Sequence, residues 1–210
     1  MKKILLIILF STNLLFGQEY FEGIITFKTE ITTTEFASEK LQENLEYNYG
    51  DILKVFYKKN GSFIRKYLNT GEYGNNYQIY FNDTGELLIT TKGNNKIDTL
   101  DVTKNSLKLI EKSIVNNKET IMDLKCDCII YSSLNERKEN VTLEFCYSSN
   151  VTELDPNRFQ KHNDYFLNNY FSLSKRPYLK FRLKTKELEL TFTATEITEK
   201  KLTENDLTEK

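Results

Sequence analysis

The chain has 210 residues, with 29 Lys or Arg against 30 Asp or Glu, so its net charge at pH 7 is −1. Loss of Lys2 and Lys3 with a leader would make the balance 27 basic against 30 acidic residues. The charges are interspersed and form no basic patch, which argues against nucleic acid as a partner.

The first residues, MKKILLIILFSTNLLFGQ, have the order of a secretory signal peptide. Two lysines precede an apolar run over residues 4–10, which is shorter than the ~20 residues of a membrane-spanning helix. We predict a signal peptide over residues 1–17 and an exported chain, periplasmic or extracellular, that is soluble after cleavage. An uncleaved N-terminal anchor is the alternative. No later segment is apolar enough to span a membrane.

The rest of the chain is predicted to form an antiparallel sheet. Short apolar runs are separated by turn signals roughly every 8–12 residues, and 13 Tyr and 14 Phe accompany only 2 Pro. The first run alternates strictly, so Phe21, Ile25, Phe27 and Ile31 share one face of a long strand.

The segment after this strand changes to a helical period. Ser38 is a candidate N-cap, and Gly50 is a candidate stop. Leu41, Leu45 and Tyr49 would point inward. We therefore predict one short amphipathic helix between two strands.

Strands then resume with a β-hairpin signal, the Asn-Gly pair at 60–61 between two alternating runs. Phe63 and Tyr67 share one face of the second strand. In the run YQIYF, Ile79 and Phe81 share one face. Apolar side chains occur on both faces of these strands, which predicts a sheet covered on both sides.

All three cysteines lie in the stretch 125–147, which is predicted to be a β-hairpin. Cys126 and Cys128 are two apart on one strand, so their side chains run parallel with Cα atoms ~6.6 Å apart. A bridge from Cys128 or Cys126 to Cys146 is more natural, because hairpin arms run about 5 Å apart.

The alternation of apolar and polar residues on the two arms argues against that bridge, because it places the cysteines of the two arms on opposite faces. The predicted apolar face of the first arm carries Leu124, Cys126, Cys128 and Ile130. The apolar face of the second arm carries Leu143 and Phe145, which leaves Cys146 pointing away from the other two cysteines unless a bulge intervenes. Three buried thiols that act as small apolar residues are the alternative. In both cases the hairpin is structural rather than an active centre.

No metal site, cofactor or catalytic residue is predicted. A structural zinc site needs four ligands, a redox thiol usually shows C-x-x-C, and the one histidine, His162, lies in no nucleophile or zinc motif. An enzyme is therefore disfavoured. A hydrolase that uses paired carboxylates remains an alternative, because two acids could converge from anywhere in the chain.

The segment that follows the cysteine hairpin is ambiguous. Asp155 before Pro156 resembles an N-cap with proline at the first helical position. Phe159, Phe166 and Tyr170 would lie on one face of a short helix or in an aromatic-rich loop.

The final hairpin has the clearest register. A two-residue turn at 185–186 would pair Leu183 with Leu188, Phe181 with Leu190, and Leu179 with Phe192. It would also set Arg182 opposite Glu189 on the other face. The polar end is predicted to be a loose tail over residues 204–210, so that residues 18–203 form a single antiparallel β domain.

The order of these parts resembles secreted proteins of Bacteroidetes-type bacteria that share the LolA-like, lipoprotein-carrier-like fold. The stretches ETIMDLKCDCIIYSS, YSSNVTELDP and ELTFTATEITEKKL carry the resemblance. A neighbouring group has a Gly-Leu-Pro-Gly-Leu-Ile motif, which is absent between Asp155 and Pro177. The resemblance implies a strongly curved antiparallel sheet, an incomplete barrel whose concave side is closed by one or two short helices and which carries lipids or acyl chains.

We therefore expect a binding or carrier protein for an apolar ligand such as a lipid or acyl chain. A non-enzymatic envelope scaffold that binds a protein partner through strand edges or the segment 159–171 is the alternative. The residues expected to line the ligand site are Phe27, Ile31, Phe63, Tyr67, Ile79, Phe81, Leu179, Phe181, Leu190 and Phe192.

Overall fold

The computed structural model describes residues 20–94 and 96–208, so the predicted signal peptide lies outside the described residues. Within the described part of the chain, the helices are all too short or too polar to cross a membrane.

The strands are β1 Gly23–Thr33, β2 Ile52–Tyr57, β3 Phe63–Leu68, β4 Asn75–Phe81, β5 Glu86–Thr91, β6 Ile97–Asp101, β7 Lys108–Ile121, β8 Leu124–Leu134, β9 Asn140–Tyr147, β10 Lys180–Lys184 and β11 Leu188–Glu199. The α-helices are α1 Glu39–Tyr49, α2 Leu167–Ser174 and α3 Glu204–Thr208, and two 3₁₀ turns are η1 Pro156–Phe159 and η2 Asp164–Phe166. Strands β2 to β9 follow one another without an intervening helix, α1 lies between β1 and β2, and a long segment with η1, η2 and α2 joins β9 to β10.

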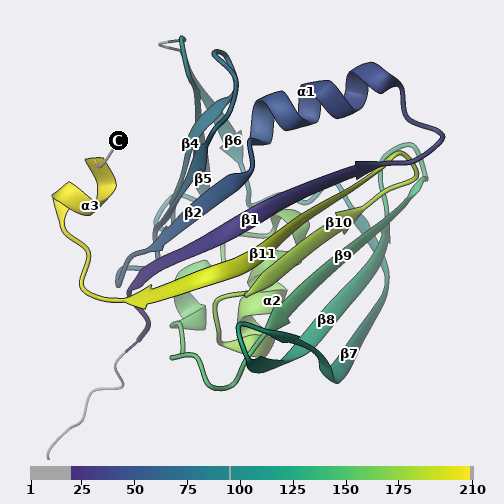
Figure 1. The fold of residues 1–210 in the computed structure, drawn as a ribbon. Coiled ribbons are helices and arrows are strands. Elements are labelled where there is room, and N and C mark those ends of the chain that lie inside the picture. Colours follow the sequence, from purple (N-terminus) through teal and green to yellow (C-terminus); the bar gives the residue numbers. More distant parts are fainter. Residues whose placement is uncertain (1–19, 95, 209–210) are drawn as a thin grey trace, which may run out of the picture.

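The strands form one antiparallel sheet of 11 strands in the order β6-β5-β4-β3-β2-β1-β11-β10-β9-β8-β7. Strands β6 and β7 lie at its two edges, so the sheet is curved but not closed (Figure 1). The predicted fold class, a mainly β protein with a strongly curved antiparallel sheet that forms an incomplete barrel, is confirmed. Its centre is the pairing of β1 with β11, which joins two half-sheets.

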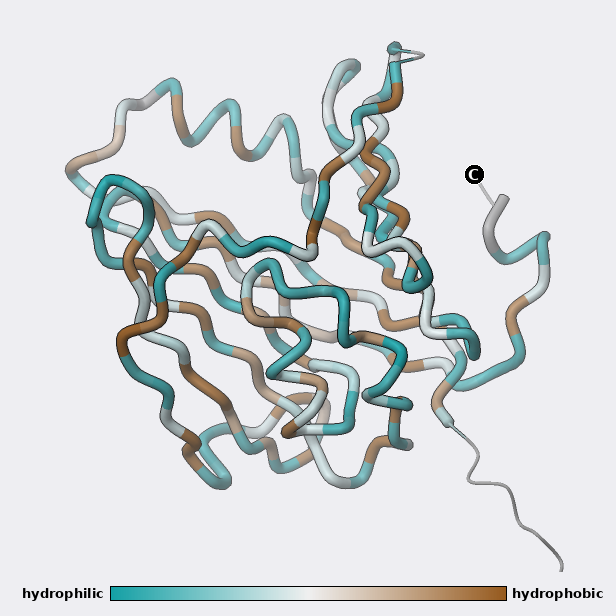
Figure 2. The backbone as a smooth tube through the Cα atoms, turned by 180° about the vertical axis from the view of Figure 1, so that it is seen from behind, coloured by the Kyte–Doolittle hydropathy of each residue, from teal (hydrophilic) through white to brown (hydrophobic). Residues whose placement is uncertain are grey.

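The concave face is covered by the segment between β9 and β10. Helix α2 and the loops around it lie behind the strands in Figure 1 and in front of them in Figure 2. Phe159, Leu167, Tyr170 and Phe171 of this segment are almost completely buried. The ring centroids of Phe145 on β9 and Tyr170 on α2 are 4.8 Å apart, so the segment is an integral part of the core.

Several local predictions are confirmed. Helix α1 has Ser38 as N-cap and Gly50 as C-cap, as the periodicity indicated. The Asn-Gly turn at 60–61 joins the antiparallel pair β2–β3, with Gly61 at a φ of 87°. Asp155 caps η1 by accepting a hydrogen bond from the backbone N–H of Asn157 at 3.1 Å.

The predicted register of the last hairpin is wrong by two residues. Phe181 pairs with Phe192, and Leu183 pairs with Leu190. The turn is longer than predicted because the backbone N–H of Thr185 bonds the Leu188 carbonyl at 2.8 Å. A shift of two keeps every side chain on its face, so the apolar set still points inward.

The predicted facing of two other strands is also reversed. On β8 the core side carries Ile129 and Tyr131, which are fully buried, whereas Cys128 lies on the convex side. On β4 the core side carries Tyr80, which is fully buried, so Ile79 and Phe81 lie on the convex side. In both strands, burial of a large tyrosine ring in the core determines which side chains face the core.

The polar C-terminal segment forms the short helix α3. Lys200 forms an ion pair with Asp206, and the Thr203 backbone N–H donates to the same carboxylate at 2.8 Å. These contacts hold the start of α3 near the end of β11.

Candidate ligand-binding cavity

A cavity of about 230 Å³ lies between the concave face of the sheet and the segment that covers it. Strands from both half-sheets contribute apolar side chains, and the covering segment contributes the opposite wall. The lining residues are Tyr49, Arg65, Tyr67, Gln78, Leu87, Ile89, Leu100, Phe145, His162, Asp164, Tyr165, Leu167, Tyr178, Phe181, Leu183, Leu190 and Phe192. A concave, mostly apolar pocket with a few convergent polar groups is the usual form of a small-molecule site.

Larger depressions lie elsewhere on the surface. One of about 410 Å³ near Glu46 and Asp51 and one of about 530 Å³ near Glu136 and Lys186 are open and lined mostly by polar side chains. Both are more open and more polar than the central cavity, which is therefore the candidate site.

Four of the residues predicted from sequence line this cavity. They are Tyr67, Phe181, Leu190 and Phe192, and they come from β3, β10 and β11.

Three others are buried beside the cavity. Phe27 contacts Tyr178 with ring centroids 5.5 Å apart, Phe63 contacts His162 at 5.6 Å, and Leu179 is fully buried. These residues support the lining residues rather than facing the cavity.

The remaining three predicted residues lie away from it. Ile31 lines the open depression beside α1. Ile79 and Phe81 lie on the convex face, where 40% of Phe81 is exposed. The structure therefore does not bring the predicted set together as one surface.

The polar residues of the cavity escaped the sequence prediction. Arg65 is the most notable, because it lies on β3 between Phe63 and Tyr67 on the concave face. Its Nη1 donates to Gln78 Oε1 at 3.3 Å, and its guanidinium carbon lies 4.9 Å from the Phe63 ring centroid. The signal was present in the alternation, since Arg65 shares the parity of two predicted core residues.

The guanidinium of Arg65 is surrounded by tyrosines. Burial alone would lower the pKa of Arg65, but the nearby oxygens of Tyr178, Tyr67 and Tyr57 outweigh it and raise that pKa. Arg65 therefore carries its positive charge inside an apolar cavity.

His162 contributes a neutral ring to the same cavity. Its ring centroid lies 4.7 Å from that of Tyr80 and 5.6 Å from that of Phe63. Burial, with a smaller contribution from the nearby Arg65 charge, lowers the pKa of His162 to about 3. Both ring nitrogens are buried without a hydrogen-bond partner among the described residues.

The lip of the cavity is formed by η2. Burial raises the pKa of the Asp164 carboxyl, and it raises the pKa of Tyr165 to about 12. Tyr165 and Phe166 both have left-handed backbone conformations, with φ values of 52° and 58°. These two residues turn the chain sharply from η2 into α2, which places Tyr165 and Leu167 on the cavity wall.

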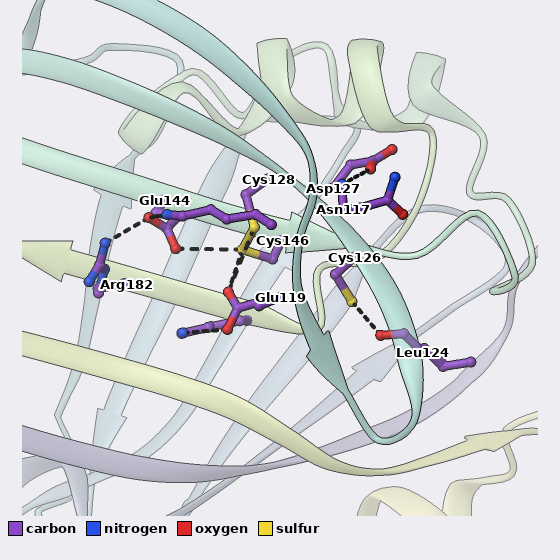
Figure 3. Close-up of a disulfide and its surroundings, with 11 residues drawn as sticks. Asn117, Glu119, Leu124, Cys126, Asp127, Cys128, Glu144, Cys146 and Arg182 are labelled. Atoms are coloured by element: carbon purple, nitrogen blue, oxygen red, sulfur yellow. Dashed lines mark hydrogen bonds and ion pairs between the residues drawn. A yellow bond between two sulfur atoms is a disulfide. The ribbon is translucent and has the colours of Figure 1, made fainter.

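A second group of polar side chains lies on the convex face, over the disulfide Cys128–Cys146 (Figure 3). The two cysteines are directly opposite on β8 and β9, so no bulge in this pair is needed to join them. The third cysteine, Cys126, is a buried free thiol whose pKa is raised by burial.

Two carboxylates point toward the disulfide sulfurs (Figure 3). Glu119 Oε1 lies 3.0 Å from Cys146 Sγ, and Glu144 is 1% exposed. A bulge in β7 between Val115 and Glu119 brings Glu119 over the neighbouring strands.

Each carboxylate is paired with cations. Glu119 contacts Lys180 at 2.8 Å, and Glu144 contacts Lys118 and, at 2.7 Å, Arg182. Burial would raise the pKa of Glu144, but Lys118 and Arg182 outweigh it and lower that pKa.

Ligand atoms of Glu119, Cys128, Glu144 and Cys146 lie within 4.8 Å of one another, a spacing that would suit a metal ion. The chemistry does not fit, because the disulfide consumes both thiolates and the carboxylates are neutralised by ammonium and guanidinium groups. This convex cluster is therefore best explained as structural.

No family model matches the chain, and a search of the curated proteins finds no match either. The resemblance to LolA-like proteins therefore remains a prediction from sequence pattern.

Proposed function

We propose that this protein binds an apolar small molecule in the central cavity and acts as an exported carrier or binding protein. The observation that carries the proposal is the partly enclosed cavity itself, whose walls are formed mainly by aromatic and aliphatic side chains from both half-sheets. The core would otherwise be expected to close over such a space, since protein interiors pack densely.

Export is supported by two independent features. The N-terminal sequence has the order of a signal peptide. The Cys128–Cys146 disulfide is typical of an oxidising compartment.

The polar groups of the cavity favour binding over catalysis. His162 has no hydrogen-bonded carboxylate or nucleophile among the described residues. Asp164 is the one carboxylate of the lining, whereas glycoside hydrolysis uses two.

Native mass spectrometry tests this proposal on mature protein purified from its own envelope without detergent. We expect extra mass that disappears on denaturation and is apolar on extraction. Bare protein would contradict the proposal if the purified protein also failed to take up added amphiphiles.

A cavity-filling variant sharpens the test. Leu183→Trp places a larger side chain on the cavity wall, whereas Ile79→Trp makes the same kind of change on the convex face. We expect the first variant to lose bound ligand and the second to retain it. Equal retention by both would show that the ligand lies elsewhere.

A second candidate function, a scaffold that binds an envelope protein, is supported by edge strand β7. Leu109, Ile110, Ile114 and Val115 on this strand are exposed, and unpaired strand edges can pair with another chain. The segment 159–171 does not supply such a surface, because most of its aromatic side chains are buried in the core.

A further inference from the structure

The position of Arg65 is the observation that extends the proposed function. A row of inward-facing residues crosses five strands of the sheet at one level. The row runs Ile25, Val55, Arg65, Gln78 and Ile89. An arginine and an amide thus replace apolar side chains on the cavity wall.

The charge on Arg65 has no ionic partner in direct contact, although it partly offsets the rise that burial causes in the pKa of Asp164 on the same cavity wall. Among the described residues, no carboxylate lies within ion-pair distance, 4.0 Å, of its guanidinium. A guanidinium has five N–H donors, and the contacts with Gln78 and Tyr178 use only part of them. Arg65 is half-buried, so a bound anion would form charge-assisted hydrogen bonds with the guanidinium donors that remain and would gain affinity there.

The hydrogen-bond donors in the cavity indicate which kind of anion would fit. A guanidinium presents its donors in a planar fork that matches a carboxylate, and the Gln78 amide lies beside it. Arg65 is the one cationic side chain of the cavity lining, and a single positive charge suits a monoanion better than a dianionic phosphate.

The cavity volume limits the length of the apolar tail that such an anion could carry. About 230 Å³ corresponds to on the order of eight water-sized groups, and a methylene group occupies about as much space as one water. The aromatic walls formed by Phe181, Phe192 and Tyr67 suit an aliphatic or aromatic tail of that size. Longer chains would have to leave through the lip at Tyr165.

We propose that the cavity binds a medium-chain monocarboxylate, with its carboxylate on Arg65 and Gln78 and its apolar tail against the aromatic wall. This inference rests on the proposed function, and it adds the head group. Asp164 lies on the same wall, and its negative charge repels an anion. We therefore expect Asp164 to lower the affinity for the carboxylate.

Isothermal titration at pH 7 with three probes of equal chain length tests the head group: octanoate, octan-1-ol and octylamine. We expect octanoate to bind at least tenfold more tightly than octan-1-ol, and octylamine to bind most weakly. If octanoate and octan-1-ol bind equally, the inference fails while the proposed function stands. If neither of them nor hexadecanoate binds, both fail.

Arg65→Met removes the charge and keeps an apolar side chain of similar length. We expect this variant to lose the tenfold preference for octanoate but to keep octan-1-ol binding, which also shows that the cavity is intact. Lys66→Met makes the same change on the opposite face of β3 and should leave the preference unchanged. An Arg65→Met protein that still prefers octanoate would overturn the inference.

Discussion

The two faces of the sheet differ in how their charged and polar side chains are paired. On the convex face, Glu144 is buried between Lys118 and Arg182, and the cluster closes over a disulfide. On the concave face, Arg65 has no carboxylate within ion-pair distance among the described residues, and His162 has two unpartnered ring nitrogens. Buried polar groups in folded proteins are normally satisfied. In the convex cluster Arg182 Nε is a buried nitrogen without a partner among the described residues, whereas both carboxylates there are paired with cations. The contrast supports the proposal that the concave groups face a ligand and that the convex cluster stabilises the fold.

The largest expected effect concerns His162 and acid. Its pKa is lowered to about 3 in the folded protein, against about 6.5 when unfolded, so only the unfolded state gains a proton between these values. Stability is therefore full above pH 6.5 and falls as the pH drops, by roughly 2.5 kcal/mol at pH 4.5 and by about 5 kcal/mol below pH 3, where both states are protonated. Urea unfolding at several pH values measures it.

His162→Phe is the matched variant, because an aromatic ring of similar shape keeps the stacking on Tyr80 and Phe63. Its stability should stay nearly constant between pH 6.5 and 4.5. The chain has one histidine, so no other imidazole contributes in this range. A wild-type protein that is equally stable at pH 5 and pH 7 would contradict a neutral, buried His162.

The disulfide on the convex face should have the next largest effect. It links residues 18 apart in sequence, and removing such a crosslink costs about 3 kcal/mol. We expect that loss for the double variant Cys128→Ser/Cys146→Ser in denaturant unfolding. Cys126→Ala, which leaves the disulfide intact, should cost only about 1 kcal/mol.

The denatured, non-reduced mass provides an independent check on the same bond. It should be lower than the fully reduced mass by ~2 Da, for the two hydrogens lost when one disulfide forms. The Cys126→Ala variant should show the same difference. If it does not, Cys126 takes part in the bond, and the pairing described above is incorrect.

Breaking the charge cluster should cost somewhat less. Glu144→Gln leaves Lys118 and Arg182 facing a neutral amide, with an expected loss of about 2 kcal/mol, because both cations are partly exposed and screened. Glu189→Gln is the control, since it removes a half-exposed partner 3.6 Å from Arg182 and should cost less than about 0.5 kcal/mol. Equal losses for the two variants would show that burial of the pair does not matter.

The smallest effect concerns Asp164 at the cavity lip. Asp164→Asn removes a negative charge that opposes an anionic ligand, so octanoate should bind roughly two- to fivefold more tightly. Octan-1-ol should bind unchanged. Asp123→Asn, an exposed change in the β7–β8 turn, should alter neither affinity. Weaker octanoate binding by Asp164→Asn would show that this carboxyl helps to hold the ligand.

The sequence pattern predicted more of the fold than of the site, because the signals for strands and helix ends are local. Strict alternation identified the buried face of β1, and Ser38 with Gly50 bounded α1, because both signals are local. The register of β10 and β11 was missed, since a slip of two residues preserves both faces and only the turn hydrogen bonds at Thr185 distinguish the alternatives.

The polar half of the site was missed because charged residues are normally exposed. Alternation alone places Arg65 inward with Phe63 and Tyr67, yet no local signal says that an inward arginine will be tolerated. That tolerance depends on Gln78 from the next strand and Tyr178 from far along the chain. Such contacts emerge only once the strands are assembled.

The pairing of β1 with β11 at the centre of the sheet has a kinetic consequence. It joins Gly23 to Glu199, so the ladder that unites the two half-sheets closes a very long loop. Such non-local pairings slow folding, typically to milliseconds or longer. In each half-sheet, neighbouring strands follow one another in the chain, so each half-sheet can form early, but until β11 pairs with it β1 has an unpaired edge. The covering segment has only part of its concave surface until then, so we expect the cavity to be completed when β11 pairs with β1.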